Sequence, residues 1–281
     1  MSRVWMITGS AGGLGAGIAR AALVNGDQVV ATDLDVARLD QTYSSDQVMT
    51  AALDIRDEQQ AQTVVAAAIA RFGRIDVLVN NAGYGQFGPF EEVEPEAIER
   101  QFATNVFGTF NVTRAVLPVM RRQRSGHLVM MSSNGGFKGV RGASMYSASK
   151  FAIEGFSEAL AEEVAEFGIR LTLLEPGAFR TDFLDSRMLK LGTRALEDYA
   201  EFRARTLAVF EARNHRQIGD PDRLGLAVVQ LAALAAPPLR FVAGSDALSV
   251  VEAKLDQVRA DLERWRSLST STDFPQQRPL S

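Results

Sequence analysis

The chain has 281 residues, of which 46% are hydrophobic and 23% charged, and its formal net charge is −4. This is the composition of a globular protein. Proteins that bind nucleic acid present an excess of basic residues, so the negative net charge speaks against nucleic acid as a partner. The sequence has no cysteine and only two histidines, so we expect no disulfide, no thiolate nucleophile and no metal site. No apolar run is long enough to span a bilayer and the first residues lack an export signal, so we expect a cytoplasmic protein without membrane association.

Short apolar or β-branched runs alternate with longer segments of helical period. Strands are predicted at residues 4–8, 28–33, 48–53, 75–80, 127–132, 169–174 and 240–243. Helices are predicted at residues 14–25, 35–43, 58–72, 95–122 (with an interruption near Gly108), 146–167 and 246–265, and a further one begins at Asp220 and Pro221. Strands that alternate with helices in this way predict parallel βαβ units. We therefore expect an α/β fold of the Rossmann type: one doubly wound parallel sheet of about seven strands, with helices on both faces.

The domain organisation is predicted to be simple. No repeat or linker divides the chain, so residues 1–267 are expected to form a single domain. The Ser/Thr/Gln/Pro-rich end, residues 268–281, is predicted to be a mobile tail.

The first predicted strand runs into a glycine-rich segment that opens a helix. Its residues are Thr8, Gly9, Ser10, Ala11, Gly12, Gly13, Leu14 and Gly15. Glycines allow a tight turn and a close approach of the backbone to a pyrophosphate, and the helix N-terminus presents free N–H groups to it. The segment therefore predicts a dinucleotide site.

The second predicted strand ends in Asp33, twenty positions after Gly13. A carboxylate at this place accepts hydrogen bonds from the adenosine ribose hydroxyls and repels a 2′-phosphate. No Lys or Arg lies between Ser10 and Gly17 to pair with such a phosphate. We therefore predict NAD as the cofactor and expect NADP to be disfavoured.

Tyr146 and Lys150 lie four residues apart on a predicted helix, a spacing that puts a phenol and an ammonium group on one face. An ammonium group about 4–5 Å from a phenolate, at an effective dielectric constant of ~20, stabilises it by roughly 3–4 kcal/mol. This would lower the pKa of the phenol by about 2 to 3 before burial opposes it. Tyr146 is therefore predicted to act as the base in alcohol oxidation and as the acid in the reverse reaction.

Further residues fall at the expected separations from this pair. Ser133 precedes Tyr146 by thirteen residues, and Asn105 lies in an N-x-x-G element of the preceding long helix. With the glycine-rich loop, the Asn80–Gly83 stretch N-N-A-G and the segment P-G-x-x-x-T from Pro176 to Thr181, the sequence resembles the classical short-chain dehydrogenase/reductase family.

The resemblance implies a role for each of these residues. Ser133 would hold the substrate oxygen, Lys150 would also bind the nicotinamide ribose, and Asn105 would position a water molecule of a proton relay. The residues implied to contact the cofactor are Gly9, Ser10, Gly13, Leu14, Gly15, Asp33, Asp54, Ile55, Asn81, Ala82, Gly83, Tyr146, Lys150, Pro176, Gly177 and Thr181.

The resemblance also points to a small-molecule substrate and to a homodimer or homotetramer built on the helices predicted at 95–122 and 146–167. The substrate pocket is expected to include a variable region at about 183–215. Phe87, Phe90, Phe137, Met145, Phe183, Leu184, Met188 and Leu189 are candidates for its lining and predict a hydrophobic substrate.

The leading hypothesis is an oxidoreductase that transfers a hydride between NAD and a secondary alcohol or ketone, acting on CH–OH groups. Three alternatives stay open: an epimerase or dehydratase of the longer branch of the family, an NADP-dependent carbonyl reductase, and an NAD-binding regulator without turnover. The thirteen-residue interval between Ser133 and Tyr146 speaks against the first. The presence of both Tyr146 and Lys150 speaks against the last.

Overall fold

The structure is a computed structural model that describes residues 2–185 and 189–274. Its centre is a seven-stranded sheet in the order β3-β2-β1-β4-β6-β7-β9, with every neighbouring pair parallel. The strands are β1 (Val4–Thr8), β2 (Gln28–Asp33), β3 (Val48–Ala52), β4 (Val77–Asn80), β6 (Gly126–Met131), β7 (Ile169–Pro176) and β9 (Arg240–Ala243). The predicted Rossmann-type sheet is confirmed. The strand order reverses between β1 and β4, where doubly wound sheets open a crevice at the carboxyl ends of their strands.

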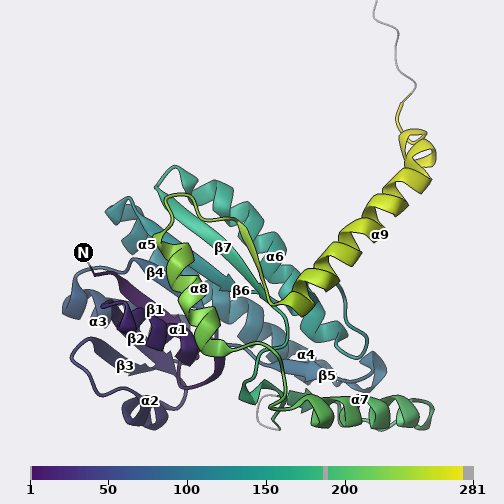
Figure 1. The fold of residues 1–281 in the computed structure, drawn as a ribbon, viewed down its shortest axis with the longest axis horizontal. Coiled ribbons are helices and arrows are strands. Elements are labelled where there is room, and N and C mark those ends of the chain that lie inside the picture. The colour runs from purple at the N-terminus through teal and green to yellow at the C-terminus, as the bar shows by residue number, and fades with distance from the viewer. Residues whose placement is uncertain (1, 186–188, 275–281) are drawn as a thin grey trace, which may run out of the picture.

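Helices cover both faces of this sheet (Figure 1). Their bounds are α1 (Gly13–Val24), α2 (Val36–Thr42), α3 (Glu58–Phe72), α4 (Pro95–Phe102), α5 (Thr109–Gln123), α6 (Ser144–Ala165), α7 (Ala200–Arg213), α8 (Pro221–Ala233) and α9 (Ser245–Thr270). Alternate residues of a strand face opposite sides. Trp5 and Ile7 of β1 accordingly pack in the core with α1, α2 and α8, whereas Val4 and Met6 pack with α3, α5 and α6.

The helix predicted at 95–122 is divided by a π-helical turn, Ala103–Gly108. The divided helix thus has its interruption where Gly108 suggested one. A Cβ atom on Gly108 would lie 2.6 Å from Cγ1 of Ile55, so the glycine lets the helix approach the loop after β3. Single π-helical turns of this kind occur frequently at functional sites.

A second, two-stranded parallel sheet was not predicted. It pairs β5 (Gly85–Phe87) with β8 (Leu189–Leu191). The two strands have three residues each and stand about a hundred positions apart, so no local period signals them. This small sheet joins the segment after N-N-A-G to the variable region.

The last helix is longer than predicted. α9 continues through Thr270, where the Thr270 hydroxyl donates to the carbonyl of Arg266 one turn earlier. Residues 268–270 are therefore helical and not part of a tail; of the rest of the predicted tail, 275–281 lie outside the described residues. Among the helices of residues 2–185 and 189–274, none combines the length and the apolar character needed to cross a membrane.

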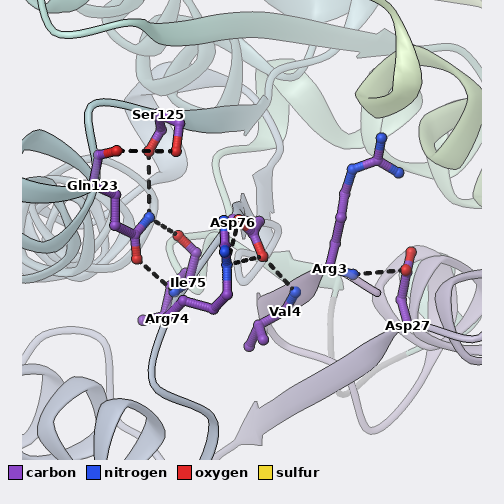
Figure 2. A network of polar contacts seen from close by, with 8 residues as sticks. All are labelled: Arg3, Val4, Asp27, Arg74, Ile75, Asp76, Gln123 and Ser125. Carbon is purple, nitrogen blue, oxygen red and sulfur yellow. Dashed lines mark hydrogen bonds and ion pairs between the residues drawn. The ribbon is translucent and has the colours of Figure 1, made fainter. Parts of the chain in front are cut away.

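Polar contacts hold together the end of the sheet opposite the strands' carboxyl ends (Figure 2). The Asp76 carboxylate accepts a hydrogen bond from the backbone N–H of Val4 at 2.9 Å and pairs with Arg74 at 2.5 Å. The Gln123 side chain accepts from the N–H of Ile75 at 3.1 Å and donates to its carbonyl at 2.8 Å. Because the Gln123 side chain takes up both backbone groups of Ile75, this residue does not join the sheet, and β4 begins at Val77 and not at the predicted residue 75.

A histidine is buried near this end of the sheet. The exposed fraction of His127 is 2%, and its Nε2 lies 2.9 Å from Oγ1 of Thr172. Burial, aided by Arg170 and Arg3, lowers the pKa of His127 from 6.5 to about 4. Between pH 4 and pH 6.5, His127 is therefore protonated in the unfolded chain and neutral in the folded chain.

We therefore expect the free energy of unfolding to fall as the pH drops from 6.5 to 4, by up to about 3 kcal/mol from this group. Urea denaturation at several pH values in this window measures the slope. His127→Gln keeps an uncharged polar side chain and should flatten the dependence; an unchanged slope in this variant would assign the effect to other groups.

Candidate active site

The predicted site residues come together at the carboxyl ends of β1, β4, β6 and β7, as expected for a doubly wound sheet. Four loops begin there, and they carry the glycine-rich segment, the N-N-A-G stretch, Ser133 and the segment after Pro176. The long helix α6 adds Tyr146 and Lys150.

The glycine-rich loop is held against the N-N-A-G stretch by reciprocal hydrogen bonds. Oγ1 of Thr8 accepts from the N–H groups of Asn81 and Ala82, both at 3.0 Å. Nδ2 of Asn81 donates to the carbonyls of Thr8 at 2.9 Å and Gly9 at 3.0 Å. A Cβ atom on Gly15 would lie 2.4 Å from the Gly9 oxygen, so only glycine permits this closure.

The same loop forms a cradle at the N-terminus of α1. Gly13 has a φ of +56°, and no side chain caps the helix there. A Cβ atom on Gly13 would meet the Thr181 side chain at 3.6 Å, so the loop after β7 faces the glycines across the opening. A cavity of about 340 Å³ lies here, lined by the glycine-rich loop, Arg38, Arg180 and Thr181 among others. Free helix N–H groups beside an open, cation-lined cavity fit a pyrophosphate.

Asp33 lies against the glycine-rich loop. One carboxylate oxygen accepts from the N–H of Ala11 at 3.1 Å, and the other accepts from the N–H of Asp35 at 3.2 Å. The Tyr43 hydroxyl donates to the Ser10 carbonyl at 2.8 Å and so also attaches the segment after β2 to the glycine-rich loop. The Asp33 carboxylate thus lies beside the cradle, as predicted from its position at the end of the second strand.

Arg38 is a site residue that sequence reasoning missed. Arg38 lies in the first turn of α2. The Asp35 side chain caps that helix by accepting from the N–H of Arg38 at 3.1 Å. Its Nη2 lies 2.9 Å from where a Cβ of Gly12 would be and 3.4 Å from Asp182. The guanidinium group therefore adjoins the cradle. Its signal in the sequence is a basic residue within one helical turn of the acidic end of β2.

Asp54 and Ile55 follow β3, the strand that pairs with β2 at the edge of the sheet. Arg56 pairs with Asp54 at 2.5 Å, and this hydrogen bond lowers the pKa of Asp54. Ile55 is buried against Gly108. After β7, the N–H of Ala178 donates to Asp246 at 2.8 Å and so ties the loop from Pro176 to the start of α9.

Tyr146 and Ser133 face the same spot. A Cβ atom built on Gly135 would lie 3.4 Å from Cε1 of Tyr146 and 3.5 Å from Oγ of Ser133. Burial raises the pKa of Tyr146, and its hydrogen bond with Ser133 opposes this rise. Ser133 in turn caps a short turn by accepting from the N–H of Gly135 at 3.1 Å. The two side chains therefore lie on either side of one point next to Gly135.

Lys150 lies below this pair. Its Nζ donates to the Met131 carbonyl at 2.7 Å and lies 5.8 Å from the centre of the Tyr146 ring. Burial lowers the pKa of Lys150 to about 8, against the attraction of Glu154. The expected lowering of the Tyr146 pKa is not found, because the pKa is raised instead. The physical reason is that desolvation of the phenol outweighs the favourable contacts.

Asn105 occupies the π-helical turn. Its Oδ1 accepts from the N–H of Tyr84 at 3.1 Å, and its Nδ2 donates to the Tyr84 carbonyl at 3.0 Å and to Oγ of Ser149 at 3.3 Å. A Cβ on Gly83 would lie 3.1 Å from Oδ1 of Asn105, so N-N-A-G ends in glycine where the amide approaches. The wide turn directs Asn105 toward α6, one residue from Lys150.

An aromatic wall surrounds Tyr146. The Phe87 ring stacks at 5.6 Å from the Tyr146 ring, and Phe183 lies 5.8 Å from it. Phe210 of α7 packs edge-on against Phe87 at 5.2 Å, although the sequence did not single it out. The small β5–β8 sheet brings Leu189 into the same cluster. The phenol therefore stands among apolar side chains.

Not every predicted lining residue is there. Phe90 is exposed, and Phe137 lies beneath the Arg240 guanidinium at 5.7 Å. Met188 lies outside the described residues.

Three acidic or histidine side chains stand close together beside this wall. Asp182, Asp185 and His215 each place one polar atom within 4.8 Å of the others. Asp185 pairs with His215 at 3.2 Å and accepts from Asn214 at 2.7 Å. These contacts account for the grouping, and we assign it no metal.

Behind Lys150, Arg240 of β9 binds three carboxylates. It pairs with Glu175 at 2.7 Å, with Glu158 at 2.6 Å and with Glu154. Glu154 and Glu175 are buried, and burial raises the pKa of each. The guanidinium group thus compensates charges that would otherwise be isolated under the catalytic helix.

Comparisons with known proteins agree with this geometry. The short chain dehydrogenase family model matches residues 3–191. "Oxidoreductase BOA17" of Botryotinia fuckeliana is 37% identical over 97% of this chain and 100% of its own length. The 3-ketodihydrosphingosine reductase of Bacteroides thetaiotaomicron is 41% identical over 68% of this chain and 71% of its own.

Solved structures show the same relationship. A short-chain dehydrogenase from Streptomyces avermitilis is 39% identical, has a TM-score of 0.89, and matches over 98% of this chain and 100% of its own. A 3-ketoacyl-(acyl-carrier-protein) reductase from Brucella melitensis, solved with NADH, is 29% identical with a TM-score of 0.71, over 86% of this chain and 95% of its own. The chain belongs to the short-chain dehydrogenase family and is an NAD(P)-dependent oxidoreductase.

Proposed function

We propose that the protein transfers a hydride between NAD and a hydrophobic secondary alcohol or ketone. The observation that carries this proposal is that the Tyr146 and Ser133 side chains both lie next to Gly135. Buried Lys150 lies close to them, and the glycine-rich loop forms its cradle at the same end of the sheet. An acid–base group, an oxyanion donor and a dinucleotide cradle are the three parts that such a reaction needs.

Four residues have distinct tasks in this proposal. Tyr146 takes the hydroxyl proton in oxidation and returns it in reduction, while Ser133 donates a hydrogen bond to the substrate oxygen as charge develops there. The bound nicotinamide supplies the hydride acceptor. Lys150 holds the nicotinamide ribose and stabilises the phenolate, and Asn105 orients a water molecule that exchanges protons with Lys150.

The aromatic wall supports a hydrophobic substrate. Phe87, Phe183 and Phe210 offer ring faces and edges beside the reacting phenol. A relative at 41% identity is named a reductase of 3-ketodihydrosphingosine, which fits an apolar ketone. A panel of secondary alcohols graded by chain length, followed at the absorbance of the reduced nicotinamide, tests this. We expect kcat/KM to rise with apolar length; a preference for short polar alcohols would contradict it.

Cofactor choice depends on Asp33 and Arg38, which pull in opposite directions. Asp33 repels a 2′-phosphate, and we propose that it decides for NAD. The Arg38 guanidinium beside Gly12 is the observation that favours the second candidate, an NADP-dependent carbonyl reductase.

Asp33→Ala is expected to shift the ratio of kcat/KM for NAD⁺ over NADP⁺ toward NADP⁺ by about tenfold or more, as loss of a close charge repulsion worth ~1.4 kcal/mol or more predicts. Arg38→Ala is the matched control and should shift the ratio the other way. An unchanged ratio in Asp33→Ala would show that Asp33 does not set the preference. Tight NADH binding with no turnover on any substrate would favour a regulator.

We further propose that the protein forms homodimers or homotetramers through the faces of α5 and α6. Phe151 of α6 is exposed, as is Phe107 in the π-helical turn before α5, and Phe110 packs against Phe156 at 4.2 Å. Exposed aromatic residues beside a packed aromatic pair are typical of an interface.

A further inference from the structure

The helix α9 leaves the body of the protein. Figure 1 shows it projecting as a free rod from the end of β9. It has 26 residues, which gives a length of about 39 Å. Only Ala247 and Val251 are buried, and every residue from 255 to 274 is exposed. Isolated helices in water are marginal unless an apolar face finds a partner.

Such an apolar face runs along α9. Its members are Leu248, Val251, Leu255, Val258, Leu262 and Trp265. Their spacings alternate between three and four residues, which is the a/d pattern of a two-helix coiled coil. Leu255 is 48% exposed, Leu262 64% and Trp265 50%, so the seam is open beyond its base. Leu248, beside the body, is itself 47% exposed.

We propose that α9 pairs with α9 of a second copy of this chain, antiparallel, with the two-fold axis between residues 256 and 257. In this register Leu255 lies across from Val258 of the second copy, and Leu248 lies across from its Trp265. Each member of the seam then lies across from another member; Val251, at the base of the seam, is already buried by the body of its own chain. The pairing surface is separate from the α5 and α6 faces and does not rest on the proposed catalytic function.

The charges beside the seam choose this arrangement. In the antiparallel register Glu252 comes next to Arg259 of the second copy, and Lys254 next to its Asp261; symmetry repeats both pairs. Four opposite-charge contacts result. In a parallel, in-register pair Lys254 would instead face Arg259 of the second copy and Asp261 would face its Arg266, so two repulsive contacts would stand against two attractive ones. Sliding the antiparallel pair by one heptad, with the axis near residue 260, would place Arg259 against Arg259 and Asp261 against Asp261.

The charge balance speaks against a lipid surface as the occupant. Helices that lie on anionic membranes carry a polar face rich in Lys and Arg. Over Ser245–Thr270 five acidic residues stand against four basic ones: Asp246, Glu252, Asp256, Asp261 and Glu263 against Lys254, Arg259, Arg264 and Arg266.

Cysteine cross-linking of the full chain tests the orientation without background, because the chain has no cysteine. Leu248→Cys and Trp265→Cys are prepared separately and mixed under oxidation. Antiparallel pairing brings residue 248 of one copy to residue 265 of the other, whereas like residues stay about 25 Å apart. We expect a disulfide-linked dimer in the mixture and none in either variant alone. Cross-linking of each variant with itself would overturn the antiparallel arrangement.

The molar mass by light scattering tests whether the seam holds copies together. Leu255→Asp with Leu262→Asp is expected to lower the mass twofold, whether from tetramer to dimer or from dimer to monomer. Ala260→Asp puts the same charge on the opposite face of the helix and should leave the mass unchanged. An unchanged mass in the double variant, or binding of wild-type protein to vesicles of anionic phospholipid through this seam, would overturn the proposal.

A charge exchange tests the flanking pairs. Lys254→Asp and Asp261→Lys should each weaken association severalfold, and the double variant should restore it. Equal weakening in the double variant would overturn the register.

Discussion

Tyr146→Phe is expected to lower kcat by about 10²- to 10⁴-fold, which is the usual contribution of a positioned acid–base group. Phenylalanine keeps the ring and hence the contacts with Phe87 and Phe183, at 5.6 and 5.8 Å in the native site. Only the hydroxyl that exchanges the proton is lost. The fold and the glycine cradle should be unaffected, so NADH binding measured by fluorescence should change little.

The pH dependence gives an independent check on the same residue. Oxidation needs the phenolate form of Tyr146, so its rate should rise with pH, whereas the rate of ketone reduction should fall as pH rises. Because burial raises the pKa of Tyr146, the rise in the oxidation rate is expected on the alkaline side of neutrality. Tyr199→Phe, which removes an exposed phenol bound to Glu91, is the matched control and should leave kcat within about twofold. If Tyr146→Phe retained more than a tenth of the native kcat, another group would be the acid–base catalyst.

Arg240→Met is expected to destabilise the fold by about 3–5 kcal/mol, the cost of leaving buried charges without a partner. The guanidinium group binds Glu154 and Glu175, whose side chains are buried, together with Glu158 at the surface. Without it, the two buried carboxyl groups must take up protons or open the structure to water. Urea denaturation at pH 7 measures the loss.

Two further variants separate this effect from the removal of an arginine as such. Arg74→Met breaks the partly exposed pair with Asp76 at 2.5 Å and should cost no more than about 1 kcal/mol. Adding Glu154→Gln and Glu175→Gln to Arg240→Met should recover part of the loss, because neutral amides need less compensation. A cost of Arg240→Met equal to that of Arg74→Met would mean that water already solvates the buried carboxylates.

Several elements followed from local patterns. The strands Val4–Thr8, Gln28–Asp33 and Arg240–Ala243 and the helix Glu58–Phe72 have the predicted bounds. The Asp220–Pro221 signal also marks a helix start, since Asp220 accepts from the N–H of Asp222 at 2.9 Å. Apolar period and capping are properties of neighbouring residues, and neighbours in the sequence decide them.

Other features depended on contacts between distant segments. Arg38 reaches Gly12 only because α2 packs beside the first loop, and Phe210 reaches Phe87 only because α7 folds back over β5. The rise in the Tyr146 pKa has the same origin, since its desolvation comes from the whole wall around it. Apart from the place of Arg38 shortly after the acidic end of β2, none of these has a local signature.

The sequence by itself determined the alternation of strands and helices, the glycine-rich loop that follows the first strand, and the Tyr146–Lys150 pair. Each is specified by residues within a few positions of one another, where helical period, strand alternation and glycine content are decisive. Only the tertiary structure decided the aromatic wall around Tyr146, the ion pairs of Arg240 with three carboxylates, and the exposure of the apolar seam of α9. These depend on which surfaces meet or fail to meet after folding, and burial, ion pairing and exposure are properties of that packing and not of the local chain.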